Sequence, residues 1–385
     1  MRKIAIITTT RAEYGVLKPV IKAIEDCKEL ELQLIVSGTH LSKKFGKTIQ
    51  EIKKDGFNIT KEVPILIEEE SKLRIIQTIS NAILNLGKVF NEIKPDFVLI
   101  LGDRYEALAT TIAATNLNIP IAHFHGGDIT EGGLDEPTRH SISNFANIHF
   151  VCTQRSAKIL KKMGEEEFRI HIVGPLGTAL MDKNLLPSKQ DIKEKLEIDL
   201  EKPSILFVQH PVTTNLENVE KEFTATLEAL KEIGMQTIIL YPNADAGGLK
   251  AISIIEKYKN TNNFFVFKNI DYPLFQSLMK YSKVMVGNSS AALIEAPFFK
   301  LPAVNIGYRQ RNRERTSNLI DCESEKNVII TAIRKAISKE FIKSLDKMHN
   351  PYDIGKNPLK MVVDTLVNTE INTKLIQKRK NFENV

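Results

Sequence analysis

DFVLILGDRYEAL (96–108) decides the fold of this 385-residue chain, together with IPIAHFHGGD (119–128). Each stretch begins with a short apolar run and ends in polar or glycine-containing sequence. Short apolar runs that lead into amphipathic segments are typical of buried parallel strands joined by helices. In an open parallel sheet, ligands bind at the carboxyl ends of the strands, which is where these polar residues lie.

The polar residues after these two runs are mostly acids and bases. Between 102 and 142 the chain holds six carboxylates interleaved with histidines and arginines, and four of them could do chemistry. We interpret this segment as an acid/base centre, with the candidate catalytic residues Asp103, Asp128, Asp135 and Glu136. The spacings H-x-x-x-H and H-E-x-x-H are absent, so no metal site is predicted. G-x-G-x-x-G, Walker and G-x-S-x-G patterns are absent as well, so neither a dinucleotide or NTPase loop nor a serine nucleophile is predicted.

The same strand-then-helix pattern recurs along most of the chain. Further apolar runs occur at 3–9, 32–38, 148–153, 170–175, 204–211, 237–243, 264–269, 283–290 and 302–307. Two series of such runs, separated by a polar stretch near 181–203, predict an α/β fold with two Rossmann-like, doubly wound parallel-sheet domains. We expect an N-terminal domain over 1–173, a C-terminal domain over 174–357 and a C-terminal helical segment over 358–385.

Composition narrows the class of protein. Hydrophobic content of 42%, charged content of 26% and interspersed charges with a net of +6 are those of an ordinary globular protein that binds small anions rather than nucleic acid. The three cysteines have no paired or metal-type spacing, which favours a reducing compartment and buried apolar thiols. No apolar run reaches the length of a membrane span. We therefore expect a cytoplasmic protein with no membrane association.

Other polar residues also follow apolar runs, in both halves of the chain. GNSSAALIE (287–295) predicts a helix that begins near two serines, a good phosphate site, with an acid that could accept from ribose hydroxyls. Arginines at 309, 311, 313 and 315 could grip a diphosphate. Each residue type also has an ordinary structural use, as a helix cap, turn former or solvated loop. We predict a substrate and nucleotide site in the cleft between the domains, formed by Arg11, His40, Arg139, His140, His210, Asn243, Asp245, Ser289, Ser290, Glu295, Arg309 and Arg313.

The ordered set of motifs resembles the hydrolysing UDP-N-acetylglucosamine 2-epimerases of sialic-acid and related nonulosonate synthesis. The motifs are RAEYG (11–15), SGTH (37–40), GDRYE (102–106), HGGD (125–128), DE-x-x-RH (135–140), QHPVTT (209–214), PN-x-DAG (242–247), GNSS (287–290) and NIGYRQ (305–310). The resemblance implies a glycosyltransferase-B architecture and a C-terminal helix that returns to the first domain. Two positions depart from the family: Asp128 stands where many members have Glu, and Asn312 stands where they have Gly.

The resemblance also implies a reaction that needs no cofactor. The nucleotide leaves C1 as a carboxylate takes the C2 proton, and water and a proton then add to the resulting 2-acetamidoglucal. The expected substrate is UDP-N-acetylglucosamine, giving N-acetylmannosamine and UDP. The alternatives are a UDP- or GDP-linked 2,4-diacetamido-2,4,6-trideoxy sugar on a legionaminic-acid route, a non-hydrolysing epimerase, a glycosyltransferase and a non-catalytic nucleotide-sugar sensor. We expect a homodimer or homotetramer.

Overall fold

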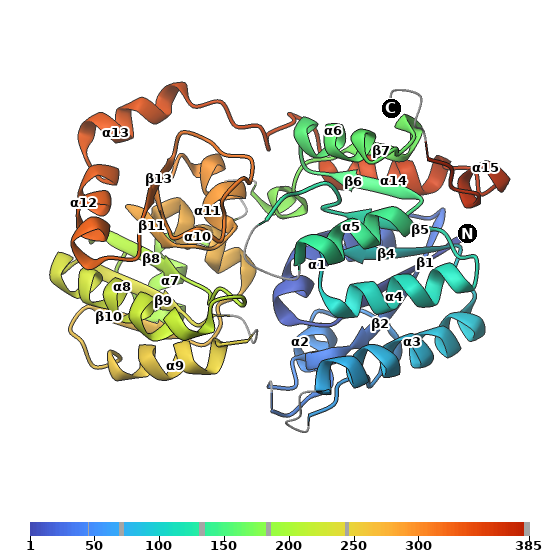
Figure 1. The fold of residues 1–385 in the computed structure, drawn as a ribbon, viewed down its shortest axis with the longest axis horizontal. Coiled ribbons are helices and arrows are strands. Elements are labelled where there is room, and N and C mark those ends of the chain that lie inside the picture. Colours follow the sequence, from blue (N-terminus) through green and yellow to red (C-terminus); the bar gives the residue numbers. More distant parts are fainter. Residues whose placement is uncertain (45, 69–72, 131–134, 182–185, 243–245, 381–385) are drawn as a thin grey trace. The chain divides into compact units, whose positions relative to one another are not determined.

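The computed structural model describes the chain except for residues 45, 69–72, 131–134, 182–185, 243–245 and 381–385 (Figure 1). The chain forms two compact units. Unit 1 comprises Met1–Asp128, Leu134–Ala179 and Ile354–Val385, and unit 2 consists mainly of Leu180–Asp353. Each unit has its own sheet and its own helices, and the two are described separately below.

Unit 1 is built on a parallel sheet with the strand order β3-β2-β1-β4-β5-β6-β7 among the described residues. The strands are β1 (Arg2–Thr8), β2 (Leu30–Ser37), β3 (Ile59–Val63), β4 (Phe97–Leu101), β5 (Ile121–Phe124), β6 (Ile148–Val151) and β7 (Ile170–Ile172). The strand order reverses between β1 and β4, so the chain leaves these two neighbours in opposite directions. A crevice at the carboxyl ends of the strands forms at such a point in doubly wound folds.

Helices cover both faces of the unit 1 sheet because alternate strand residues point to opposite sides. Ile4 and Ile6 of β1 belong to one apolar core with α1, α2 and α14, whereas Ala5 and Ile7 belong to another with α3, α4 and α5. The helices are α1 (Arg11–Glu25), α2 (Ile49–Lys54), α3 (Arg74–Ile93), α4 (Tyr105–Asn116), α5 (Asp135–Phe145), α6 (Gln154–Lys162), α14 (Pro358–Asn368) and α15 (Thr373–Ile376).

The C-terminal segment is bound to the rest of unit 1 through its backbone. Arg2 donates to the carbonyl oxygens of Leu366 and Val367 at the end of α14. The buried Arg169 donates to the carbonyl oxygens of Lys374 and Leu375 in α15 at 2.8 and 2.9 Å. The segment also packs into the apolar core that contains α1, through Val362, Leu366 and Leu375. Arg2 and Arg169 therefore bind the backbone of a segment that is held by apolar packing as well.

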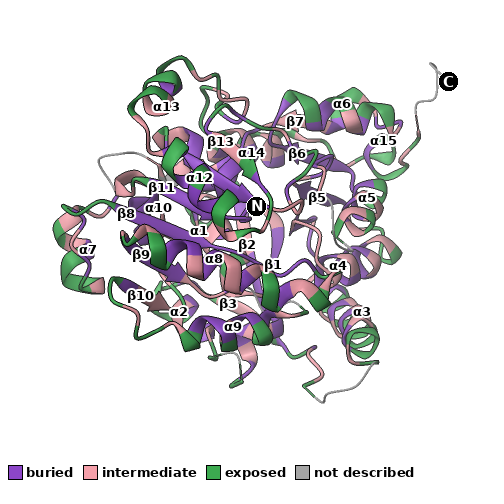
Figure 2. Cartoon of the chain, turned by 60° about the vertical axis from the view of Figure 1, so that its left-hand side comes forward, coloured by how far each residue is buried: buried purple, intermediate pink, exposed green. Residues whose placement is uncertain are grey.

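Unit 2 repeats the architecture with the strand order β10-β9-β8-β11-β12-β13, also parallel throughout its described residues. Phe207 and Val286 lie in a core with α8, α9 and α12, and the alternating residues Leu206 and Met285 are buried as well. In Figure 2 the strand β8 has the colour of buried residues. The strands are β8 (Ser204–Val208), β9 (Gln236–Leu240), β10 (Phe264–Phe267), β11 (Val284–Gly287), β12 (Ala303–Ile306) and β13 (Leu319–Cys322). The helices are α7 (Lys189–Leu196), α8 (Val219–Ile233), α9 (Gly248–Lys257), α10 (Tyr272–Tyr281), α11 (Ala291–Ile294), α12 (Lys326–Ala336) and α13 (Lys339–Ser344).

The predicted fold class, α/β with two doubly wound parallel sheets, is confirmed. Two local predictions need correction. The helix expected after Ser289 has only the four residues of α11, and Glu295 ends it instead of lying inside it. The helical segment expected over 358–385 is interrupted between α14 and α15. The motif DE-x-x-RH lies in the first turns of α5, which begins at Asp135. Among the residues that the structure describes, no helix is both long and apolar enough to span a membrane.

Gly287, the last residue of β11, tests how closely the unit 2 strands are packed. Its φ is +131°, and a Cβ placed there would lie 2.0 Å from the carbonyl oxygen of Val208 on β8. We expect Gly287→Ala to lower the unfolding free energy by about 1–3 kcal/mol, the cost of a strained backbone, with the clash adding to it. Urea denaturation measures this change. The matched control is Gly87→Ala inside α3, where a Cβ meets nothing within 4 Å and helix propensity favours alanine. Equal effects of the two substitutions would contradict this account.

Candidate active site

The guanidinium of Arg139 is the centre of the acid/base cluster in unit 1. Arg139 lies on α5, and its side chain is only 2% exposed. It forms an ion pair with Asp103, donates to Glu136 at 3.0 Å and donates to the carbonyl oxygen of Asp128 at 2.9 Å. A buried guanidinium is stable only when its charge and its N–H groups are satisfied, so Arg139 draws three predicted site residues to one place.

Asp103 and Glu136 remain reachable from solvent although both are paired with Arg139. Their side chains are 24% and 28% exposed. Glu136 also accepts from Nε2 of His140 at 3.1 Å, and Nδ1 of His140 is buried without a hydrogen-bond partner among the described residues. Asp135 is exposed on the first turn of α5, where a carboxylate is favoured by the helix dipole. Three carboxylates therefore lie at or near the N-terminus of one helix.

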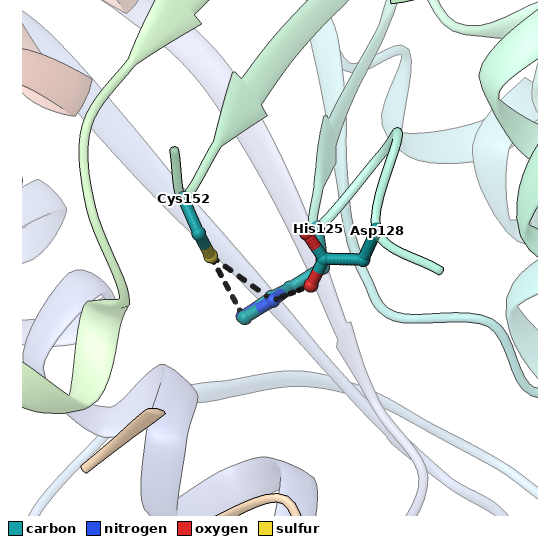
Figure 3. A group of neighbouring side chains, drawn as sticks. All are labelled: His125, Asp128 and Cys152. Carbon is teal, nitrogen blue, oxygen red and sulfur yellow. Dashed lines mark hydrogen bonds and ion pairs between the residues drawn. The ribbon is translucent and has the colours of Figure 1, made fainter. Parts of the chain in front are cut away.

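Asp128 differs from the other acids because it is buried, with a side chain only 5% exposed. Ser156 on α6 donates to its Oδ1 at 2.8 Å, and Nδ1 of His125 lies 3.2 Å from its Oδ2. His125 also lies 3.2 Å from the sulfur of Cys152, at the end of β6 (Figure 3). Burial lowers the pKa of His125, but Cys152 and Asp128 outweigh this effect and raise it.

The backbone conformation of the HGGD loop determines where His125 and Asp128 lie. His125 has a φ of +68°, in the left-handed region that non-glycine residues seldom adopt. Gly127 follows with a φ of +75°, and a Cβ there would lie 2.3 Å from the carbonyl oxygen of Ser156. A glycine is therefore required where the HGGD loop contacts α6, and that contact brings Asp128 to Ser156.

His123 binds the turn that carries Asp103. It is fully buried in β5, and its Nε2 lies 2.7 Å from the carbonyl oxygen of Gly102 in the turn that carries Asp103. Burial lowers the pKa of His123 to about 3, so the ring is neutral near pH 7. A neutral ring donates one fixed hydrogen bond, and here that bond holds the turn that presents Asp103.

The ends of β1 and β2 carry a separate group of residues. Arg11 forms an ion pair with Glu51 at 2.7 Å. His40 is buried, and its ring nitrogens lie 3.1 Å from Oγ1 of Thr8 and 2.7 Å from Oγ1 of Thr48. Burial lowers the pKa of His40 to about 4. This environment is that of a structural histidine, and the predicted substrate role of His40 stays a prediction.

Glu13, next to Arg11 in α1, was not predicted as a site residue. It accepts from the backbone N–H and the hydroxyl of Thr9 at 2.9 and 2.8 Å. Burial raises its pKa to about 7 in spite of these two bonds. A carboxyl that can carry a proton near neutral pH, at the point where the strand order reverses, is a further acid/base candidate.

Asn288 organises the predicted nucleotide site of unit 2. Its side-chain amide accepts from the backbone N–H of His210 at 2.7 Å and donates to the His210 carbonyl oxygen at 2.8 Å. Its own carbonyl oxygen accepts from Arg309 at 3.2 Å and from Gln310 at 3.0 Å. One residue thus joins the segments that follow β8, β11 and β12.

The remaining predicted residues of unit 2 lie on these segments or beside them. Arg313 donates to Oε1 of Gln310 at 3.3 Å, and Ser289 accepts from the backbone N–H of Ala291. Ser290 precedes α11, but four residues are too few for the extended helix dipole expected there. Glu295 accepts from the hydroxyl of Tyr272. Asn243 and Asp245 lie outside the described residues.

Sequence reasoning missed Cys152, Ser156 and Asn288. Cys152 was interpreted as an apolar buried thiol, and it is buried, but it contacts a histidine. Its position directly after an apolar strand, as for His125, was the available signal, since β5 and β6 are neighbours. Asn288 was part of the GNSS motif but was overlooked in favour of the two serines.

The arrangement suits proton transfer next to a cationic or electron-poor centre. The carboxylates of Asp103 and Glu136 pair with one guanidinium, which also donates to the backbone carbonyl oxygen of Asp128, and His140 pairs with Glu136. Acids of different exposure therefore lie within one cluster. Unit 2 offers cationic and amide groups instead, which suit an anionic ligand.

The chain is similar in sequence to known epimerases. The family model described as UDP-N-acetylglucosamine 2-epimerase matches residues 22–366. The chain is 40% identical to the GDP/UDP-N,N'-diacetylbacillosamine 2-epimerase (hydrolyzing) of Campylobacter jejuni, over 99% of this chain and 98% of that protein. It is 36% identical to the UDP-N,N'-diacetylbacillosamine 2-epimerase (hydrolyzing) of Legionella pneumophila, over 92% of this chain and 93% of that protein.

Another relative and a solved structure come from one organism. The UDP-N-acetylglucosamine 2-epimerase of Neisseria meningitidis is 35% identical over 88% of each chain. A crystal structure of UDP-GlcNAc 2-epimerase from Neisseria meningitidis bound to UDP-GlcNAc has a TM-score of 0.80 at 21% identity, covering 96% of this chain and 100% of that one, which shows a shared fold. With the family model covering most of its length, the chain belongs to the UDP-N-acetylglucosamine 2-epimerase family.

Proposed function

We propose that this enzyme is a hydrolysing epimerase that releases a free 2-epimerised amino sugar and UDP. The single observation that carries the proposal is the set of carboxylates around Arg139, because inversion at C2 needs a group that removes the proton and a group that returns it. The two relatives of 40% and 36% identity, both named as hydrolysing, support water as the acceptor.

The proposed first substrate is UDP-N,N'-diacetylbacillosamine, and UDP-N-acetylglucosamine is the second. The sequence motifs favoured the opposite order. The relatives named for the diacetamido sugar match at 40% and 36% identity, however, and cover more of the chain than the Neisseria meningitidis enzyme, which matches at 35%. The two sugars share the 2-acetamido group at which the reaction takes place, so the same acid/base set serves either one.

The acids of unit 1 have different tasks in this proposal. Asp103 and Asp135, with Glu136 as the substitute for Asp135, contact the sugar, because these side chains are at least partly exposed. One of them removes the C2 proton as the C1–oxygen bond to the nucleotide breaks, and another returns a proton after water adds to C1. Asp128 is buried and acts through its hydrogen bond to His125.

The nucleotide is assigned to unit 2. Arg309, Arg313 and His210 neutralise the departing diphosphate, and Ser289 and Ser290 donate to it. Expulsion of the nucleotide leaves an oxocarbenium-like sugar, so cations belong at the diphosphate and carboxylates at the sugar ring. The distribution of charge between the two units follows this demand.

The reaction is tested by incubating the purified enzyme with a nucleotide-sugar panel in deuterium oxide. We expect free UDP and a free epimerised sugar with deuterium at C2, because the proton that returns to C2 comes from a group in exchange with solvent. UDP-N,N'-diacetylbacillosamine should be turned over with the highest kcat/KM. A released sugar without C2 label would mean simple hydrolysis, and a nucleotide-linked epimer would mean a non-hydrolysing enzyme.

Asp103→Asn tests the acid/base role directly. The amide keeps the size of the side chain but cannot take a proton, so we expect turnover to fall by about 10²–10⁴-fold with little change in KM. The matched control is Asp364→Asn on α14, an exposed acid paired with Lys360, which should retain full activity. Near-normal turnover of folded Asp103→Asn would remove Asp103 from the reaction.

Arg309→Gln tests the nucleotide site. Loss of a charged hydrogen bond to the diphosphate should raise KM, and weaken UDP binding measured by calorimetry, by about 10–100-fold. The control is Arg315→Gln on the same loop, because Arg315 pairs with Asp321 at 2.5 Å, and this variant should bind UDP normally. An equal loss in both variants would indicate a general effect of net charge.

A further inference from the structure

His125, Asp128 and Cys152 bring three different donor atoms to one place. A ring nitrogen, a carboxylate oxygen and a sulfur all lie within 4.8 Å of one another. The side chains converge from the end of β6 and from the loop after β5 (Figure 3). Their positions in the sequence, 125, 128 and 152, follow no familiar metal-binding spacing, and for this reason the sequence predicted no metal.

The hydrogen bonding of this group has an unusual feature. Nδ1 of His125 lies 3.2 Å from the Cys152 sulfur and 3.2 Å from Oδ2 of Asp128. A single N–H can serve both of these neighbours only as the shared donor of a three-centre hydrogen bond. A metal ion in the position of that proton could bind the nitrogen, the sulfur and the oxygen together.

The observed spacing matches a tetrahedral zinc ion. Bonds of about 2.0–2.1 Å to nitrogen or oxygen and about 2.3 Å to sulfur place neighbouring ligand atoms about 3.3–3.6 Å apart. The two nitrogen distances are already within a few tenths of an ångström of this range. The sulfur and the carboxylate oxygen need at most about 1.5 Å of relative movement to reach it, because they lie within 4.8 Å of each other.

Further contacts orient the ligands. Ser156 donates to the second oxygen of Asp128 at 2.8 Å and leaves the first oxygen directed at His125. Metal-binding carboxylates commonly have such an outer hydrogen bond. The backbone N–H of His125 donates to the Phe150 carbonyl oxygen on β6 at 3.1 Å, which ties the loop to the strand that carries Cys152.

We propose that His125, Asp128 and Cys152 form a binding site for one thiophilic divalent cation, of which Zn²⁺ is the best match, and that its occupation inhibits the enzyme. A thiolate ligand favours Zn²⁺ over Mg²⁺ or Ca²⁺, which take oxygen ligands. Binding replaces the protons of the thiol and the imidazole with the metal. The inhibition rests on the proposed function, since the cation would occupy the Asp128–His125 pair assigned there to the reaction.

Metal binding is tested with Co²⁺, which replaces Zn²⁺ and gives a thiolate-to-metal charge-transfer absorption band when a cysteine binds it. The chain has three cysteines, so the double variant Cys27→Ser/Cys322→Ser retains Cys152 alone. We expect one equivalent of Co²⁺ to give the band in the unmodified chain and in this double variant. The band should be absent from Cys152→Ser and should be displaced by Zn²⁺.

Ser156→Ala removes the hydrogen bond to Asp128 but none of the three proposed metal ligands. It should weaken Zn²⁺ binding by about 10–100-fold, measured by competition with a chromophoric chelator. Absence of the band from the double variant, or its persistence in Cys152→Ser, would overturn the site. The double-variant result holds even if the Cys152→Ser protein folds poorly, because the double variant keeps all three ligands, and the band of Cys152→Ser is read only on protein with a native circular-dichroism spectrum.

Inhibition is measured separately on the metal-free enzyme. We expect Zn²⁺ to stop turnover, a chelator to restore it, and Ser156→Ala to shift the inhibiting concentration by the same factor as the affinity. A chain that binds Co²⁺ but keeps full turnover when saturated would overturn the inhibition. A metal-free chain that turns over no nucleotide sugar would contradict the proposed function, whereas the absorption band would still decide the metal site.

Discussion

A single buried charge, the guanidinium of Arg139, determines how the first unit is arranged around its site. A cation that is 2% exposed is tolerated only if anions and carbonyl groups surround it. Its acceptors come from the turn after β4, the loop after β5 and α5 itself, so three segments must meet at Arg139. The acids that the chemistry needs are thus also the groups that make the buried cation possible, and removal of either side leaves the other uncompensated.

In the second unit the ends of neighbouring strands are joined by an uncharged residue, Asn288. The Asn288 amide binds both backbone groups of His210, and its carbonyl oxygen accepts from two side chains of the arginine-rich loop. Asn288 is uncharged, so its bond to Arg309 positions a guanidinium without supplying a counter-charge. The contrast fits the division of tasks proposed above, in which carboxylates gather at the sugar and cations at the nucleotide.

Sequence reasoning predicted the fold well where burial dictates the pattern, and poorly where it does not. Continuous apolar runs identified the central strands and the edge strands β7 and β10. The edge strands β3 (ITKEV) and β13 (LIDC) were missed, because an edge strand has one side open and these two carry charged residues. The acids around Arg139 were predicted because residues after neighbouring parallel strands converge. The contact between Cys152 and His125 was missed, since it depends on the left-handed backbone of His125 and no residue pattern reports that angle.

Exposure separates the acids more sharply than their motifs do. A group that exchanges a proton with a sugar carbon must be able to reach that carbon, and of these acids Asp103, Asp135 and Glu136 are at least partly exposed. Asp128 has one oxygen bound to Ser156 and the other facing His125. Both contacts fit a residue that orients an imidazole. They place beside Cys152 a histidine–carboxylate pair whose geometry suits a metal ion as well as a proton.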